Sequence, residues 1–182
     1  MKKQQARRKE ALGNSLLVLL RKEPLEKITV DQICREAGVH RSTFYRYFTD
    51  KFDLLKYSFL TFMVAKLDPH DTINSVVTMI GNDKPLFRNV LINNNDVTLM
   101  NIITNMLSEQ LLQGSKEDTE NFTDINWVRN ALSTSAVPEM TAKMIAGGVL
   151  TVVVDWVEQN FQTPEEELID FFRNFMRKHT IV

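Results

Sequence analysis

Apolar side chains recur along this chain at helical rather than strand spacing. In residues 3–22 they fall on one face of a helix, with polar and charged residues between them: Ala6, Leu12, Leu16, Leu19 and Leu20. No segment keeps a period-two alternation for long, and the β-branched run 149–154 lies inside a longer apolar stretch that is typical of a buried helix. The pattern therefore predicts an all-α fold.

Helix breakers and capping residues divide this pattern into segments. Pro24 ends the first helix, Thr29 followed by Gln32 has the spacing of a capping box, and Thr49 or Asp50 can cap the fourth helix. We predict about nine main helices and one short helix, around 122–132, in a polar loop of residues 114–137. The main helices cover residues 3–22, 28–37, 40–48, 51–67, 71–80, 85–93, 97–113, 138–161 and 165–178.

The charge of the chain is unevenly distributed. Residues 1–60 contain 13 Lys and Arg against 7 Asp and Glu, a net charge of +6, whereas the other 122 residues contain 9 and 16, a net charge of −7. A basic N-terminal third on an acidic body favours a polyanionic partner for the first part only. Uneven surface charge without a function is the alternative, and charge alone does not exclude it.

Two short predicted helices that meet at Gly38 form a candidate helix-turn-helix. Gly38 suits the turn because a residue without a Cβ tolerates a positive φ at a helix end. Apolar residues can fill the interior of the pair: Ile33, Cys34, Ala37, Val39, Phe44 and Phe48. Polar and aromatic residues, none of them acidic, crowd the second helix: His40, Arg41, Ser42, Thr43, Tyr45, Arg46 and Tyr47. Such groups bond to phosphates and base edges in a DNA groove.

The stretch from Ile28 to Leu55 makes this motif more specific. It combines Ile28-Thr29, Ala37-Gly38-Val39, Ser42-Thr43-Phe44-Tyr45, Tyr47-Phe48 and Lys51-x-x-Leu54-Leu55, and it closely resembles the DNA-binding domain of the TetR (tetracycline-repressor-like) family. The resemblance covers about 50 residues with the first helix. It implies a three-helix DNA-binding domain in residues 1–55 and a helical dimerisation and ligand-binding domain in residues 56–182. Ser42 is a small departure, because the family often has Gly or Ala there.

The resemblance also implies which residues contact DNA. Arg41 is the best candidate for a bidentate contact with a guanine, the commonest specific pairing. Its neighbours on the recognition helix would face base edges or nearby phosphates: His40, Ser42 and Thr43. Contacts with the sugar-phosphate backbone, or for Tyr45 with a thymine methyl, are implied for a second set: Thr29, Val30, Tyr45, Tyr47 and Lys51. A basic arm would add salt-sensitive attraction: Lys2, Lys3, Arg7 and Arg8.

The last 45 or so residues resemble the C-terminal domain of a Gram-positive subgroup of the same family. The resemblance rests on Gly147-Gly148-Val149-Leu150, Asp155-Trp156-Val157 and the segment 163–168. By that analogy, helices 138–161 and 165–178 would pair with their copies in a homodimer. A two-fold pair of recognition helices is what a palindromic operator requires.

Residues in these two helices give a separate physical argument. Gly147 and Gly148 each cost about 1 kcal/mol relative to Ala in a helix, and the close approach of another helix would offset that cost. The last helix carries an aromatic stripe formed by Phe171, Phe172, Phe175 and Met176. Packing within one chain explains both features as well as a dimer does, so the pattern leaves the two open.

A cavity for an apolar small-molecule effector could lie in the C-terminal part. The candidate lining residues are Phe62, Met63, Met79, Phe87, Met100, Ile103, Met106, Trp127, Met140 and Met144. A plain hydrophobic core is the alternative for each of them.

The sequence contains no motif that predicts an enzyme. It has no His-x-x-x-His, Cys-x-x-Cys, Gly-rich phosphate loop or Gly-x-Ser-x-Gly, and His70 and His179 are isolated. We expect no catalytic site, cofactor or metal. A single cysteine, Cys34, and no run of 18 uncharged apolar residues predict a cytoplasmic protein without a membrane partner.

The sequence therefore predicts a DNA-binding transcriptional regulator, a homodimer on a palindromic operator. Repression relieved by a small molecule is the expected mode of action. A ligand-independent regulator or activator of the same fold is an alternative. So is a helical adaptor whose basic end binds an acidic protein.

Overall fold

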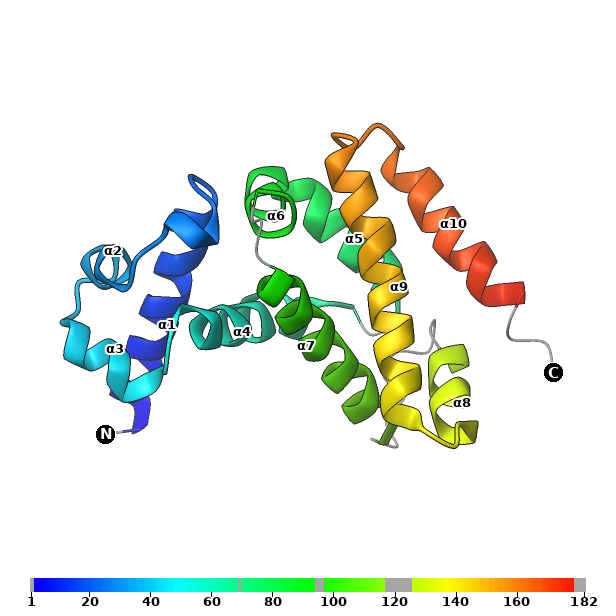
Figure 1. The fold of residues 1–182 in the computed structure, drawn as a ribbon, viewed down its shortest axis with the longest axis horizontal. Coiled ribbons are helices and arrows are strands. Elements are labelled where there is room, and N and C mark those ends of the chain that lie inside the picture. Colours follow the sequence, from blue (N-terminus) through cyan, green and yellow to red (C-terminus); the bar gives the residue numbers. More distant parts are fainter. Residues whose placement is uncertain (1, 69, 94–96, 117–125, 179–182) are drawn as a thin grey trace. The chain divides into compact units, whose positions relative to one another are not determined.

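The computed structural model describes residues 2–68, 70–93, 97–116 and 126–178, and within these ranges the chain forms ten α-helices and no β-strand (Figure 1). This confirms the all-α prediction. The helices are α1 (Lys2–Leu20), α2 (Val30–Glu36), α3 (Arg41–Tyr47), α4 (Lys51–Phe62), α5 (Thr72–Asn82), α6 (Lys84–Leu91), α7 (Val97–Lys116), α8 (Asn126–Thr134), α9 (Pro138–Glu158) and α10 (Glu165–Lys178). Two short 3-10 helices, η1 (Leu25–Lys27) and η2 (Val64–Lys66), lie between them.

Most predicted helices are present, and the differences lie at their ends. The helix expected over 51–67 stops at Phe62 and continues as η2, and the helix expected to end at Phe161 stops at Glu158. Asn160 and Phe161 each have a φ of 59°, which an α-helix does not accommodate. The short helix expected at 122–132 corresponds to α8; residues 117–125 lie outside the described residues.

The chain divides into two compact units. The domain boundary expected after residue 55 stays a prediction. The first unit combines residues 1–66 with 83–99, and the second combines 67–82 with 100–182. The first unit takes in α6 because this helix packs on α1 and α4. Asn89 Nδ2 donates to the Leu20 carbonyl at 2.8 Å. The Phe59 and Phe87 rings meet edge to face at 6.1 Å.

The core of the first unit forms where α1 crosses α4. Most of the apolar face predicted for α1 is buried: Leu12, Leu16 and Leu20 are each 0% exposed. Ala6, which was also predicted on this face, is exposed. Gly13 lies at the crossing, and a Cβ there would come within 2.7 Å of Phe62 Cε2. The glycine therefore permits the close approach of the two helices.

The second unit is built around α9, the long helix coloured from yellow to orange in Figure 1. The β-branched run 149–154 lies within it, as predicted. Ala142 of α9 packs with Val128 and Leu132 of α8. Trp156 Nε1 donates to the Thr163 carbonyl at 2.7 Å and ties the end of α9 to the segment before α10.

By length and composition alone, α9 could cross a membrane. Within the second unit, one of its sides is nevertheless buried against neighbouring helices: Ala142, Ala146, Leu150, Val153, Trp156 and Val157. We interpret α9 as a core helix of this unit.

Candidate nucleic-acid interface

The turn between α2 and α3 forms as predicted around Gly38. Gly38 has a φ of 64°, in the left-handed region that favours glycine. The Val39 amide donates to the Cys34 carbonyl at 3.0 Å, and the Gly38 amide donates to the Arg35 carbonyl at 3.2 Å. These two bonds are those of a Schellman motif, which satisfies the last carbonyls of α2. The motif sets the direction in which the chain enters α3.

The start of α2 has the capping box expected from its sequence. Thr29 Oγ1 accepts from the Gln32 amide at 3.2 Å, and the Thr29 amide donates to Gln32 Oε1 at 2.7 Å. Gln32 Nε2 also donates to Glu23 Oε1 at 3.0 Å. The capping box thus joins α2 to the segment that follows α1.

Replacing Thr29 with Ala should lower the free energy of unfolding by about 1 kcal/mol. The reason is that the backbone N–H of Gln32 loses the Thr29 hydroxyl as its acceptor. Urea denaturation followed by circular dichroism measures this. Thr29→Ser keeps the hydroxyl and should retain most of the stability. Equal losses in both variants would show that the methyl group, and not the cap, is responsible.

Buried aromatic side chains pack between α3 and the helices α1 and α4. Phe44 is 0% exposed and Phe48 is 4% exposed. The Phe48 ring lies 5.3 Å from the Tyr57 ring of α4, and Lys9 Nζ of α1 lies about 5.5 Å from both rings. This underside anchors α3 on α1 and α4, so the opposite side of α3 is left at the surface.

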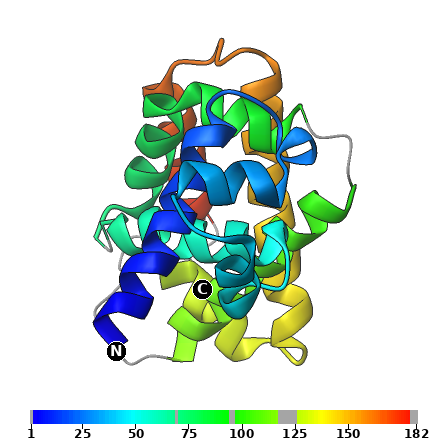
Figure 2. The same cartoon turned by 90° about the vertical axis from the view of Figure 1, so that its left-hand side faces the viewer.

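Most of the predicted DNA-contacting residues of α3, together with the residue before it, lie on that outward side. Figure 2 shows α2 and α3 facing the viewer, in front of α1. Exposed side chains there are His40, Arg41, Ser42, Tyr45 and Arg46, while Thr43 and Tyr47 are half-buried. Thr29 is exposed and Val30 is half-buried at the start of α2. The structure brings this predicted set onto neighbouring helices; their contacts with DNA stay predictions.

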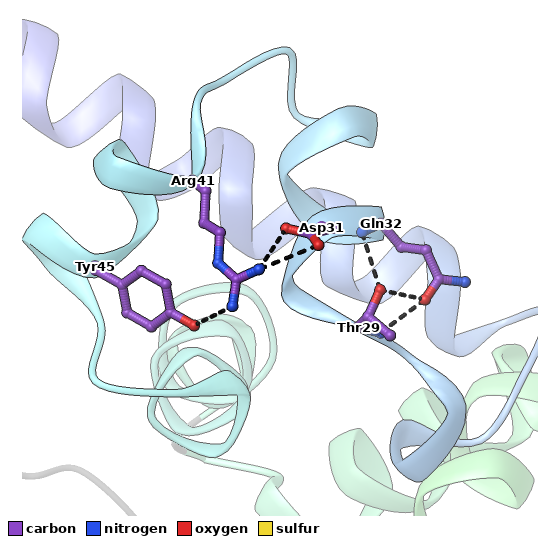
Figure 3. A network of polar contacts seen from close by, with 5 residues as sticks. All are labelled: Thr29, Asp31, Gln32, Arg41 and Tyr45. Atoms are coloured by element: carbon purple, nitrogen blue, oxygen red, sulfur yellow. Dashed lines mark hydrogen bonds and ion pairs between the residues drawn. The ribbon is translucent and has the colours of Figure 1, made fainter.

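Arg41, at the start of α3, takes part in a polar network with α2 (Figure 3). Its Nη1 donates to both carboxylate oxygens of Asp31, at 3.1 and 3.2 Å, and its Nη2 donates to the Tyr45 hydroxyl at 3.2 Å. The bond to Tyr45 and then the charge of Asp31 raise the pKa of Arg41 above its ordinary value.

Asp31 is not among the residues that the sequence predicts to be functional. An acidic side chain near a DNA-binding surface is an unfavourable candidate on charge alone. Asp31 precedes Arg41 by ten positions, and their contact depends on how α2 and α3 cross. The local pattern carries no signal for such a pair.

Lys51 has partners that the sequence did not indicate. Its Nζ donates to the carbonyls of Leu25, Glu26 and Ile28, at 2.7, 3.2 and 3.0 Å. An ammonium group has three N–H donors, so these bonds can use all of them. The phosphate contact suggested for Lys51 stays a prediction. What the structure shows is that Lys51 joins the first turn of α4 to η1.

The ten residues suggested for an effector cavity are distributed over both units. Phe62, Met63 and Phe87 belong to the first unit, and the other seven belong to the second. Met140 and Met144 are 73% and 72% exposed, so they do not line the interior of the second unit. Both lie on the outward side of α9. The effector cavity itself stays a prediction.

Two family models match parts of this chain. A family model described as "Bacterial regulatory proteins, tetR family" matches residues 17–57, and one described as "Transcriptional regulator C-terminal region" matches residues 68–178. A search of the curated proteins gives no match.

One solved structure similar to this chain is titled "Dihydroxyacetone kinase operon activator DhaS". It has a TM-score of 0.56 and 12% sequence identity, and the match covers 93% of this chain and 96% of that chain. At this identity the similarity shows a common fold. The resemblance to a Gram-positive subgroup stays a prediction.

Proposed function

Because this chain belongs to the tetR family of bacterial regulatory proteins, we propose that it regulates transcription by binding a palindromic operator as a homodimer. The family implies DNA binding and dimer formation. The observation that carries the proposal is the surface of α3, where Arg41, Ser42 and Tyr45 are exposed above the buried Phe44. A polar helix surface without acidic side chains, supported from below, can enter the major groove.

Within this proposal, the residues of α3 and its flanking segments form two groups, one that contacts bases and one that contacts the sugar-phosphate backbone. His40, Arg41, Ser42 and Thr43 face the base edges, and the Arg41 guanidinium reads a guanine. The start of α2 and the later part of α3 contact the sugar-phosphate backbone, through Thr29, Val30, Tyr45 and Tyr47. Lys51 is a further candidate for a phosphate contact, although in the protein alone its ammonium donates to the carbonyls near η1.

The outward sides of α9 and α10 are the candidate dimer interface. Met140 and Met144 of α9 and Phe171 and Phe175 of α10 are at least half exposed. A Cβ at Gly148 would meet nothing within 4 Å, so packing inside this chain does not account for that glycine. Exposed apolar area beside a mid-helix glycine is suited to the close approach of a second helix. We assign α9 and α10 to the contact between the two subunits.

Regulation by an apolar small molecule, with repression in its absence, is the expected mode of action. The similar solved structure bears the name of an activator, but at 12% identity that supports only the fold. A promoter–reporter assay with and without the protein distinguishes repression from activation. A rise in expression on adding the protein would replace repression with activation.

Arg41→Ala should lower affinity for the selected operator by about tenfold or more and remove the preference at one base pair of each half-site. The operator is first obtained by selecting duplexes from a random pool with the full-length protein. Fluorescence anisotropy with single-base variants of the selected duplex then measures affinity and base preference.

Arg35→Ala is the charge-matched control, because Arg35 is an exposed arginine at the end of α2. It should reduce affinity for all duplexes by one similar factor and keep base preference. Selection that enriches no sequence, together with no binding to duplex DNA at low salt, would overturn the proposed function. An adaptor for an acidic protein would give that result.

A further inference from the structure

The Arg41 guanidinium is held from two sides in the protein alone (Figure 3). We propose that Asp31 and Tyr45 form a clamp on Arg41, and that Asp31 thereby sets the preference for operator over other DNA without touching a base. Nη1 bonds to the Asp31 carboxylate at 3.1 and 3.2 Å, and Nη2 bonds to the Tyr45 hydroxyl at 3.2 Å. The inference rests on the proposed function, because it requires Arg41 to face the bases.

The clamp has a defined geometry. Tyr45 lies one helical turn after Arg41 on α3, and its ring centre is 5.5 Å from the guanidinium carbon. Asp31 reaches the same guanidinium from the first turn of α2. A long arginine side chain normally loses much rotamer freedom when a ligand fixes it. Because the clamp already restricts the side chain before DNA binds, the contact with a base loses less conformational entropy.

The clamped guanidinium can still bind a base. An arginine has five N–H donors, and the three bonds to the clamp leave at least two of them. The side chains of Arg41 and Asp31 are each 59% exposed, so the pair is open to an approaching groove. A guanine offers two acceptors in its major groove edge, O6 and N7, which two donors can satisfy.

Asp31 also changes the balance between operator and other DNA. Binding to unrelated sequences depends on cation–phosphate attraction and counterion release. The Asp31 carboxylate offsets the charge of Arg41 and repels phosphates, so it weakens that sequence-independent term. Readout of a guanine depends on hydrogen bonds of correct geometry, which the clamp preserves. Both effects raise the ratio of operator affinity to non-specific affinity.

Asp31→Asn tests the clamp, since it removes the charge and keeps nearly the same shape. In full-length protein, we expect about threefold to tenfold tighter binding to a scrambled duplex, with a slope of log K against log salt steeper by about one for each subunit in contact. The affinity for the selected duplex should stay constant or fall. The ratio of the two affinities should therefore drop by about threefold or more.

Glu36→Gln is the matched control, because Glu36 is an exposed acid on the same helix and removing it leaves the Arg41 contacts intact. It should change both affinities by one similar factor. In an Arg41→Ala background, Asp31→Asn should no longer change the ratio. If Asp31→Asn changed the ratio no more than Glu36→Gln, or did so equally without Arg41, the clamp would be overturned.

A measurement without DNA separates the clamp from the proposed function. In the ¹⁵N-labelled protein, rotation of the Arg41 guanidinium should be slower than that of the exposed Arg35, and Asp31→Asn or Tyr45→Phe should speed it up. Rotation as fast as that of Arg35 in the unmodified protein would contradict the clamp even if operator binding were demonstrated. Restricted rotation in a protein that selects no DNA would instead contradict the proposed function alone.

Discussion

Gly148→Leu is expected to convert the protein to a monomer and to weaken operator binding by about a hundredfold or more. A Cβ at this position meets nothing within 4 Å in the chain itself, so leucine should fit the isolated subunit. It should even favour the helix, because glycine in a helix interior costs about 1 kcal/mol relative to Ala. In the proposed dimer, the same side chain would force the facing helices apart.

The loss of DNA affinity follows from the loss of the second recognition helix. Two half-sites bound by one dimer gain an effective concentration that a monomer lacks, and this is worth about 10²–10⁴ in affinity. Analytical ultracentrifugation gives the oligomeric state, and anisotropy with the selected duplex gives the affinity.

Asn130→Leu serves as the control, because Asn130 is an exposed residue of α8 in the same unit. It adds a leucine to the surface and should leave dimer and affinity unchanged. If the Gly148→Leu protein remained a dimer with full affinity, α9 would not be part of the interface. The same exchange would then only stabilise a helix, which thermal denaturation would show as a higher Tm.

Lys51→Met is expected to lower the free energy of unfolding by about 3 kcal/mol, the largest stability effect that we predict for the DNA-binding helices. The ammonium donates to three carbonyls, and a hydrogen bond to a charged group contributes about 1.5–3 kcal/mol. The contributions do not add fully, because water can reach part of this half-buried group. Methionine keeps the aliphatic length and removes only the donors.

The unfolding measurement uses urea at a fixed protein concentration, because a dimer's stability depends on concentration. Lys27→Met, at an exposed lysine of η1, removes the same charge and should change the stability by less than about 0.5 kcal/mol. If Lys51→Met left stability unchanged and weakened binding to all duplexes alike, Lys51 would be a phosphate ligand, as the resemblance to the family implies.

The local sequence was sufficient for the features that depend on a few consecutive residues. The capping box of Thr29 and Gln32, the left-handed Gly38 and the order of the helices were predicted, and the structure confirms them. The candidate DNA surface belongs to the same class, because most of its residues follow one another from His40 to Tyr47. Helix periodicity alone separates its exposed side from the buried Phe44 and Phe48.

Contacts between distant residues could not be predicted in this way. The partners of Lys51 lie 23–26 positions earlier, and the Asp31 partner of Arg41 lies on another helix. Apolar character also failed to distinguish the buried Met106 from the exposed Met140, since both fit a helical pattern.

The amino-acid sequence by itself determined where the helices form, where they are capped and which surface of α3 carries the polar groups. Backbone hydrogen bonds, caps and helical periodicity act over a few residues, so short segments specify them. Only the tertiary structure decided that α6 packs on α1, that Asp31 holds Arg41, and that one side of α9 stays uncovered. These outcomes depend on how helices pack, and packing is a property of surfaces assembled from distant parts of the chain.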